Sequence, residues 1–494
     1  MSPSPSFPDE HTPRHSLFWR AVEHPRLIVH VMPDTYEAIG AINDELLVLR
    51  IARERSPELD TALREIAGPA PAATLAPPPA ARDDDAERAV AEDDLLGPAG
   101  VELWRLRGPE PDAIDASLRL RDLAERVRFP APDVTGSRTT LDVPAVTPNH
   151  ICVVSVNNGW CPAGPPRSTL PPSTIASGFV EEALPDYYRP QIVVIDTGYI
   201  QTHPPNAELD GHVTSVPGHW FDSHALVWRI DPPDEPDSDH DGWLDEVSGH
   251  GTFVAGQVAH QCRQATITVV GQRHEVTPLG NLASPADQAR LFTTEFSLAQ
   301  AMLDRANTDV LHCGFAFPTL TFLPSSAFSA VLNLLGSPAA PRPGVAVVCP
   351  AGNESSSNPY WPAAHPYAIG VAATNARQTA PAEFSNWSSW LNCAARGEYV
   401  LSTHLDWIGP VRGNLAEDIE EFHGWARWDG TSFAAPKISG QIAQLLVDTA
   451  SPGTLAPSLT PVQAANHLIA GTAGVPVNNL VGLAGIPLPT VLLG

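Results

Sequence analysis

The sequence predicts an α/β protein: a doubly wound, mostly parallel β-sheet with helices on both faces, preceded by a small N-terminal α+β domain. Three observations predict it. From about residue 190 onward, short and wholly apolar runs alternate with helical segments, which is typical of strands buried on both faces of a parallel sheet. Several of these runs end in polar residues, as expected at the edge where such a sheet gathers functional groups. Before residue 160, strand-like and helix-like segments surround a low-complexity stretch.

The N-terminal part divides by composition. Residues 1–16 are rich in proline and polar residues and are expected to be disordered, whereas residues 17–160 are expected to form the α+β region. Within that region RLIVHVMP has the pattern of a strand, and apolar residues at 39, 42, 46, 47 and 51 have helical spacing. An Ala-, Pro- and Asp-rich insert at about 68–97 cannot bury enough surface to order itself. Strand-like VELWRL, helix-like DAIDASLRLRDLAERV and strand-like HICVVSV complete the region.

A Pro-rich linker at 161–189 leads into residues 190–494, which are expected to form the large α/β domain. The segments expected to be its strands are QIVVID, ATITVVG, TDVLHCGFAF, GVAVVCPAGN and YAIGVAAT. A long helix with small and apolar residues on its inner face is expected to follow residue 430.

Charge and composition exclude several classes of partner. The chain has 29 basic and 56 acidic residues and a formal net charge of −27, which argues against a nucleic-acid partner, because phosphate binding needs clustered Lys and Arg. Its first residues lack the apolar segment of a secretory signal, and no apolar run has the length of a membrane span. We therefore expect a cytoplasmic protein without a membrane partner, and export by a non-standard route stays open.

The six cysteines form no CxxC pair and do not suggest a zinc site or a disulfide framework. Cys313 and Cys349 lie inside apolar runs and are interpreted as small core residues. Cys152 and Cys161 are close enough in sequence to form a bridge, and the sequence leaves that pairing open.

Four local motifs carry the candidate chemistry. They are IDTG with Asp196 after a strand, SGHGTFVAG with His250 at the start of an Ala/Val-rich helix, PAGN ending in Asn353, and GTSFAAP with Ser432 opening a long helix. Taken singly, each has a structural alternative, because aspartate and asparagine favour turns and serine favours helix N-caps.

The order of the motifs along the chain favours a catalytic triad over the structural alternatives. Asp196, His250 and Ser432 follow one another in the chain order of the subtilisin triad. The motifs DTG, GHGTFVAG, AGN and GTSFAAP closely resemble the signatures of subtilisin-like serine proteases (subtilases, peptidase family S8, bacterial type), from about residue 190 almost to the C-terminus. The resemblance implies a serine endopeptidase acting on polypeptides, with Asp196, His250 and Ser432 as the triad and Asn353 in the oxyanion hole. It implies no cofactor for the chemistry.

The resemblance also suggests where a substrate binds. In the family an extended peptide lies as a strand beside an edge segment, which corresponds here to Gly314, Phe315 and Ala316. Ala351 and Gly352 are also expected to bind substrate. Ala316 stands where the family pattern has glycine, so its methyl group is expected to narrow the specificity pocket.

An acidic insertion, DSDHDGWLD, precedes the histidine motif. Asp237, Asp239, Asp241 and Asp245 place oxygen ligands at alternate positions around a glycine, like the first half of a calcium loop. The closing acidic ligand is missing, because Ser248 occupies its position. A structural Ca²⁺ and a solvated acidic loop both remain open.

Two further questions have alternative answers. The N-terminal region resembles a subtilase propeptide that binds the cleft in cis, or it is an interaction module for an activating partner. The acyl-enzyme of a subtilase also serves transpeptidases and macrocyclases, and a catalytically silent peptide-binding scaffold is a further alternative. A sedolisin-type site would need glutamate at the position of His250.

Overall fold

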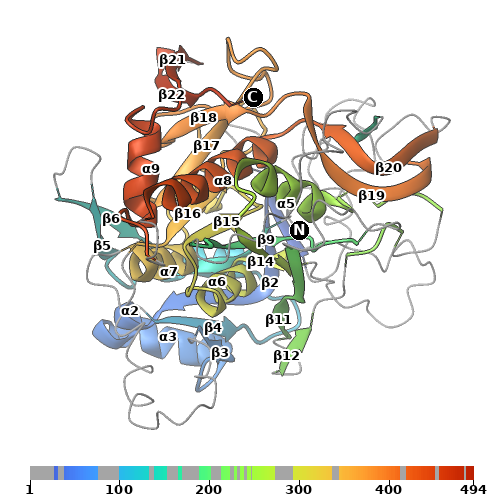
Figure 1. Cartoon of the computed structure of the whole chain (residues 1–494). Coiled ribbons are helices and arrows are strands. Elements are labelled where there is room, and N and C mark those ends of the chain that lie inside the picture. Colours follow the sequence, from blue (N-terminus) through green and yellow to red (C-terminus); the bar gives the residue numbers. More distant parts are fainter. Residues whose placement is uncertain are drawn as a thin grey trace, which may run out of the picture.

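The computed structural model describes residues 27–31, 38–75, 100–132, 138–152, 165–169, 188–201, 213–222, 227–230, 234–237, 242–245, 247–272, 293–336, 344–411, 419–450, 456–482 and 485–493. In this part of the chain, an N-terminal unit up to residue 152 packs against a larger C-terminal unit that begins at residue 188 (Figure 1).

A nine-stranded sheet forms the centre of the C-terminal unit. Its strands run in parallel except for the edge strand β21. In spatial order they are β10 (Val213–Pro217), β13 (Thr266–Gly271), β9 (Gln191–Asp196), β15 (Val310–Cys313), β16 (Ala346–Pro350), β17 (Ala368–Thr374), β18 (Cys393–Arg396), β22 (Pro487–Val491) and β21 (Val477–Val481). The expected mostly parallel sheet is confirmed.

Helices cover both faces of this sheet, because its strands are apolar on both sides. Along β9, Ile192 and Val194 join one hydrophobic cluster and Val193 and Ile195 join the other, as the two-residue alternation of a strand requires. The first cluster lies beneath α5 (His250–Gln261), α8 (Thr431–Thr449) and α9 (Pro461–Ile469), and the second beneath α6 (Glu295–Asp304) and α7 (Ser326–Gly336).

The N-terminal unit is a β-α-β-β-α-β arrangement of the split βαβ kind, with strand order β7-β2-β4-β3. A hairpin of β5 and β6 is attached to it, and β1 pairs with β2. The elements are β1 (Leu27–Val31), β2 (Ala38–Leu49), α2 (Arg50–Arg55), α3 (Pro57–Ala67), β3 (Ala73–Thr74), β4 (Val101–Arg105), α4 (Ala113–Arg121), β5 (Val127–Pro132), β6 (Arg138–Val143) and β7 (Val146–Cys152).

The helix expected across residues 39–51 is wrong, because most of this segment forms the central strand β2. β2 is buried between β4 and β7, and even its acidic residues are buried. Asp44 accepts from Arg105 Nε at 3.2 Å and Glu45 from Asn149 Nδ2 at 2.6 Å. A strand buried on both faces shows no clean alternation, and its apolar positions coincided with a helical period.

The low-complexity stretches also contain structure at their edges. Ala73 and Thr74, inside the insert expected at 68–97, form β3, whereas residues 76–99 lie outside the described residues. The linker expected at 161–189 contributes β8 (Arg167–Ser168), which pairs with β20. Both strands are only two residues long, and so short a segment leaves no periodicity to detect.

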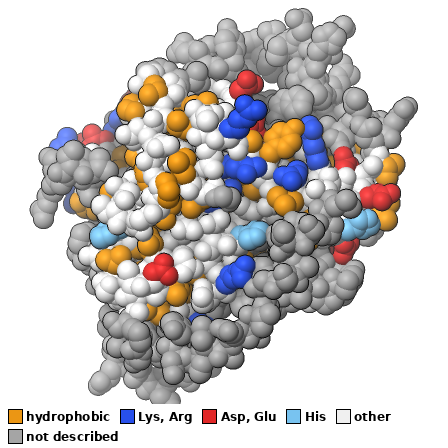
Figure 2. Space-filling model, turned by 45° about the horizontal axis from the view of Figure 1, so that its top comes forward, with side chains coloured by type: hydrophobic (Ala, Val, Ile, Leu, Met, Phe, Trp, Pro, Cys, Tyr) orange, Lys and Arg blue, Asp and Glu red, His pale blue; other side chains and the backbone are white. Residues whose placement is uncertain are grey.

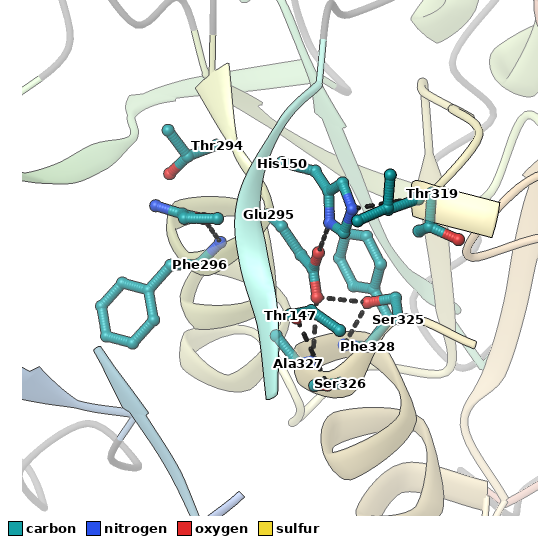
Figure 3. A network of polar contacts seen from close by, with 12 residues as sticks. Thr147, His150, Thr294, Glu295, Phe296, Thr319, Ser325, Ser326, Ala327 and Phe328 are labelled. Atoms are coloured by element: carbon teal, nitrogen blue, oxygen red, sulfur yellow. Dashed lines mark hydrogen bonds and ion pairs between the residues drawn. The ribbon is translucent and has the colours of Figure 1, made fainter. Parts of the chain in front are cut away.

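A buried polar network joins the two units (Figure 3). Strand β14 (Thr293–Thr294) of the C-terminal unit pairs with β7, and His150 of β7 donates from Nδ1 to Glu295 Oε2 at 2.6 Å. The Leu320 N–H donates to Nε2 of the same ring at 3.1 Å, which assigns the proton to Nδ1. Glu295 Oε1 accepts from Ala327 N–H at 3.0 Å and so caps α7. One hydrophobic cluster also runs through both units.

A long hairpin extends from the C-terminal unit on the right of Figure 1. It consists of β19 (Val400–Pro410) and β20 (Ile419–Trp428), with β8 as its third strand. A second pair, β11 (His219–Asp222) and β12 (Val227–Ile230), lies near α6. β20 ends three residues before α8 begins, so the hairpin leads directly into the segment that carries Ser432.

On the face shown in Figure 2, Lys and Arg side chains lie among apolar and uncharged ones without forming a continuous basic surface. None of the described helices is both long and apolar enough to cross a membrane. Cys262, Cys313, Cys349 and Cys393 are free and buried. Cys161 lies outside the described residues, so its pairing with Cys152 stays a prediction.

Candidate active site

The four motif residues lie at one end of the parallel sheet. Asp196 is the last residue of β9, and Asn353 follows the end of β16, with β15 between these two strands. His250 is the first residue of α5 and Ser432 the second residue of α8. Because the carboxyl ends of parallel strands meet at one edge and both helices pack on the same face, residues far apart in sequence converge there.

The structure brings Asp196 and His250 into direct contact. Asp196 Oδ1 lies 2.7 Å from His250 Nδ1 and also accepts from the Thr197 N–H at 2.7 Å. Both side chains are fully buried. A carboxylate can only accept in this contact, so Nδ1 carries the proton and Nε2, on the opposite side of the ring, is the basic nitrogen.

Aromatic rings hold the imidazole of His250 in place. Its ring centroid lies 5.7 Å from that of Trp428, edge to face, and 5.2 Å from that of Phe433. Phe433 directly follows Ser432 in the chain. Ser432 lies at the N-terminus of α8 and is 2% exposed. The start of α8 therefore lies beside the His250 ring.

Two further histidines near His250 are buried and neutral. Burial lowers the pKa of His312, on β15, to about 4 and that of His404, on β19, to about 3. The charge of Asp196 raises the pKa of His312, whereas charge on His250 lowers it. Because the imidazoles of His312 and His404 are both uncharged near pH 7, neither competes with His250 as a cationic partner for Asp196.

Asn353 is held in one orientation by Thr431. Its side-chain Oδ1 accepts from the Thr431 N–H at 2.7 Å and from Thr431 Oγ1 at 2.8 Å. Thr431 Oγ1 in turn accepts from the Gly352 N–H at 3.1 Å. Because a backbone N–H can only donate, the oxygen of the amide faces Thr431, and its NH₂ group points away from it. The side-chain amide of Asn353 is thus linked to Ser432 through Thr431, which directly precedes Ser432 in the chain.

Asn386 is a residue that the sequence analysis missed. Its Oδ1 accepts from the N–H groups of Glu354 and Ser356 at 3.0 and 2.9 Å, and its Nδ2 donates to Ala351 O at 2.9 Å. It therefore shapes the loop around Asn353. It lies in FSNWSSW, a segment without a periodic pattern that could have marked it.

Two of the residues expected to bind substrate pack closely against β9 and the core beside it. The Gly314 N–H donates to Ile195 O at 2.9 Å, and Phe315 is fully buried with its ring 5.8 Å from that of Phe328. A Cβ on Gly314 would lie 1.9 Å from Asp196 Oδ2, so this glycine makes room for the carboxylate. Ala316 is half-buried, and Ala351 and Gly352 are buried. Their role in substrate binding stays a prediction.

The acidic insertion is described only in part. Asp239 and Asp241 lie outside the described residues. Asp237 Oδ2 accepts from the Gly242 N–H at 2.9 Å, and Asp245 is 5% exposed. Among the residues that the structure does describe, no cluster of three or more His, Cys, Asp or Glu side chains is arranged to hold a metal. Calcium stays a prediction.

Comparison with known proteins identifies the family of this chain. The model of the subtilase family, peptidase S8, matches residues 189–484, more than half of the chain. The thermophilic serine proteinase of Bacillus sp. strain AK1 is 27% identical over 257 residues, covering 52% of this chain and 51% of the relative. Alkaline elastase YaB of Bacillus sp. strain YaB is 29% identical over 278 residues, covering 56% and 58%. The chain thus spans little more than half the length of these curated relatives.

Among solved structures, fervidolysin from Fervidobacterium pennivorans, described as a keratinolytic enzyme related to subtilisin, aligns with 17% identity and a TM-score of 0.48, covering 89% of this chain and 58% of that one. A cold-adapted subtilisin-like serine proteinase aligns with 20% identity and a TM-score of 0.40, covering 63% and 90%. On the match of the family model, the chain belongs to the subtilase family.

Proposed function

We propose that the chain is a serine endopeptidase that cleaves polypeptides through an acyl-enzyme. The observation that carries the proposal is the 2.7 Å contact between the fully buried Asp196 and His250. A carboxylate on Nδ1 fixes the tautomer that leaves Nε2 as the base. Membership of the subtilase family and the serine proteases among its relatives support the same activity.

In the proposed reaction Ser432 is the nucleophile. A serine hydroxyl is a weak nucleophile at neutral pH, so His250 Nε2 takes its proton as Oγ attacks the peptide carbonyl carbon. The protonated imidazole, stabilised by Asp196, then gives that proton to the leaving amine, and an acyl ester remains on Ser432. Water attacks the ester with His250 again acting as the base, which releases the acid and restores the enzyme.

The tetrahedral intermediate carries a negative oxygen that needs hydrogen-bond donors. We assign this role to the side-chain NH₂ of Asn353 and the backbone N–H of Ser432. The two contacts from Thr431 to Asn353 Oδ1 support the assignment, because they turn the NH₂ end of the amide away from Thr431. One such donor is worth about 2.7–4 kcal/mol of transition-state stabilisation in subtilisin.

We further propose that the N-terminal unit covers the cleft in cis as a propeptide. The pairing of β7 with β14 supports this, because it aligns the last strand of the unit with the segment that opens α6. Purified Ser432→Ala protein should then remain full length, whereas the wild type cuts itself between residues 160 and 190. Wild type that stays uncut and is fully active would favour the alternative, an interaction module for an activating partner.

The activity is tested by a peptide-library digest with mass-spectrometric readout, run beside covalent labelling by a fluorophosphonate. The wild type should label at Ser432 and cleave peptides, and Ser432→Ala should do neither. An unlabelled wild type that still binds peptides would mean a silent scaffold. Joined rather than cleaved products in the presence of an added amine would mean a transpeptidase.

We also propose that the acidic insertion binds Ca²⁺ and that the protein is cytoplasmic. A bound Ca²⁺ would involve Asp237, Asp239, Asp241 and Asp245, and would stiffen the approach to His250. Dialysis against a chelator should then lower the melting temperature, and an unchanged melting curve would remove the metal from the proposal.

A further inference from the structure

A buried carboxylate outside the motifs connects the two segments that carry Asp196 and His250. Asp234, which is 8% exposed, precedes the acidic insertion. Its Oδ2 accepts from Thr197 Oγ1 at 3.0 Å and from the Gly249 N–H at 3.1 Å. Thr197 directly follows Asp196, and Gly249 directly precedes His250. One oxygen atom thus bonds to the chain neighbours of both residues.

The hydroxyl of Thr197 does for α5 what an N-cap side chain usually does, and Asp234 holds that hydroxyl in place. The residue at the N-cap position is Gly249, in the left-handed region at φ +76°, and it has no side chain to cap the helix. The Gly251 N–H, in the first turn, donates to Thr197 Oγ1 at 3.1 Å, and the Thr197 hydroxyl in turn donates a hydrogen bond to Asp234. Asp234 thus fixes the group that caps α5, and it also accepts from the N–H of the N-cap residue itself, although it comes from a distant part of the chain.

The surroundings are packed tightly enough to transmit a displacement. A Cβ on Gly251 would lie 2.1 Å from Gly198 O, and a Cβ on Gly198 would lie 3.0 Å from the Cβ of Asp234. The turn after β9, the start of α5 and Asp234 therefore have no free space between them. If Asp234 is shortened, the turn and the helix lose their shared acceptor and can shift relative to each other.

We propose that Asp234 is a positioning residue for the reaction, which holds the turn after Asp196 and the start of α5 in register so that His250 faces Ser432. The inference rests on the proposed endopeptidase function. Proton transfer depends steeply on geometry, and a misplacement of about 1 Å costs on the order of 100-fold in rate. The bond network predicts that hydrogen-bond acceptance, rather than the negative charge, is what the position requires.

The test compares Asp234→Ala with Asp234→Asn in the full chain. Asparagine keeps an oxygen that accepts from both Thr197 and Gly249, whereas alanine keeps none. We expect kcat of Asp234→Ala to fall by roughly 10- to 100-fold, with KM within about twofold of wild type. The second-order rate of fluorophosphonate labelling should fall in parallel, and Asp234→Asn should stay within about threefold of wild type in both measurements.

Asp309→Ala is the matched control. The Oδ2 of Asp309 accepts from the Gln191 N–H at 2.8 Å, so it holds the opposite end of the same strand β9. Its loss should lower the melting temperature without changing kcat per labelled site. If Asp234→Ala does not accumulate as folded protein, Thr197→Val, which removes the connecting hydroxyl, carries the same expectation for kcat.

The outcomes separate the inference from the function on which it rests. A wild type that neither labels nor cleaves overturns both. An active wild type with an unchanged kcat in Asp234→Ala overturns the inference alone. So does a fall confined to KM, and so does an asparagine variant as slow as the alanine variant, since the charge rather than the position would then be responsible.

Discussion

The close approach of Gly314 to Asp196 allows a sharp test of the site. In Gly314→Ala the new Cβ would lie 1.9 Å from Asp196 Oδ2 and 2.7 Å from its Cγ. Cβ atoms essentially never come closer than 3.0 Å to another heavy atom, so the carboxylate must move by at least 1.1 Å, the difference between 3.0 and 1.9 Å. The backbone of Gly314 is not in the left-handed region, so the steric clash is the main perturbation.

A movement of this size away from His250 would lengthen the 2.7 Å contact to about 3.8 Å, and a donor–acceptor distance of about 3.6 Å is already no longer a hydrogen bond. Loss of the carboxylate's orienting role costs about 10⁴-fold in kcat in a serine-protease triad. We therefore expect kcat/KM to fall by roughly 10³- to 10⁴-fold, equivalent to about 4–5.5 kcal/mol of transition-state stabilisation. Overpacking should also cost about 1–3 kcal/mol of folding stability.

The assay is kcat/KM on a peptide substrate for the folded fraction, together with denaturant unfolding. Gly370→Ala is the control. Gly370 lies in strand β17 of the same sheet, and its new Cβ would lie 2.8 Å from Ala363 O, away from Asp196. It should lose stability and keep kcat. If Gly314→Ala retained more than a tenth of wild-type kcat/KM, the assignment of Asp196 as the residue that orients His250 would be refuted.

Two further predictions follow from the same region of the fold. Thr431→Val removes the hydroxyl that donates to Asn353 Oδ1 and accepts from the Gly352 N–H. Its kcat should fall about tenfold, whereas Thr431→Ser, which keeps the hydroxyl, should stay near wild type. Equal kcat values for the two variants would contradict the role of Thr431 in orienting Asn353. Lys437, the single lysine of the chain and 3% exposed, has its pKa lowered to about 7, mainly by burial and further by the charge of Arg396. The unfolded chain then binds more protons between pH 7 and the ordinary pKa of 10.5, so wild-type stability rises with pH across this window. Lys437→Met should therefore be more stable than wild type by roughly 2–4 kcal/mol at pH 6, and denaturant unfolding should show this gap shrinking by pH 10; a constant gap would disprove the buried-charge explanation.

Most of the large sheet could be predicted because its strands are short apolar runs covered on both faces. QIVVID coincides with β9, and the start of α8 falls at the GTSFAAP motif. β2 could not be assigned from its own residues. Its central place in the N-terminal sheet buries Asp44 and Glu45, and their partners come from β4 and β7, so burial there depends on tertiary contacts.

In the site, too, some residues are marked by their local sequence and others only by their tertiary contacts. The motif residues were recognisable because close packing forces glycines beside them: a Cβ on Gly251 would lie 2.1 Å from Gly198 O. Asp234 contacts Thr197 and Gly249 across sequence separations of 37 and 15 residues. Its own neighbourhood is a run of acids and prolines with no periodic pattern, so nothing local distinguishes it from the other acids of that run.

The strand β8 changes what a cut in the linker would achieve. Arg167 and Ser168 pair with β20, and the Ser168 N–H donates to Glu420 Oε2 at 2.8 Å. A cut between residues 170 and 187 would therefore leave the N-terminal fragment attached at two separate places, through β7 on β14 and through β8 on β20. Two linked attachments release far more slowly than either one alone, so the fragment would stay bound until a second cut separated them.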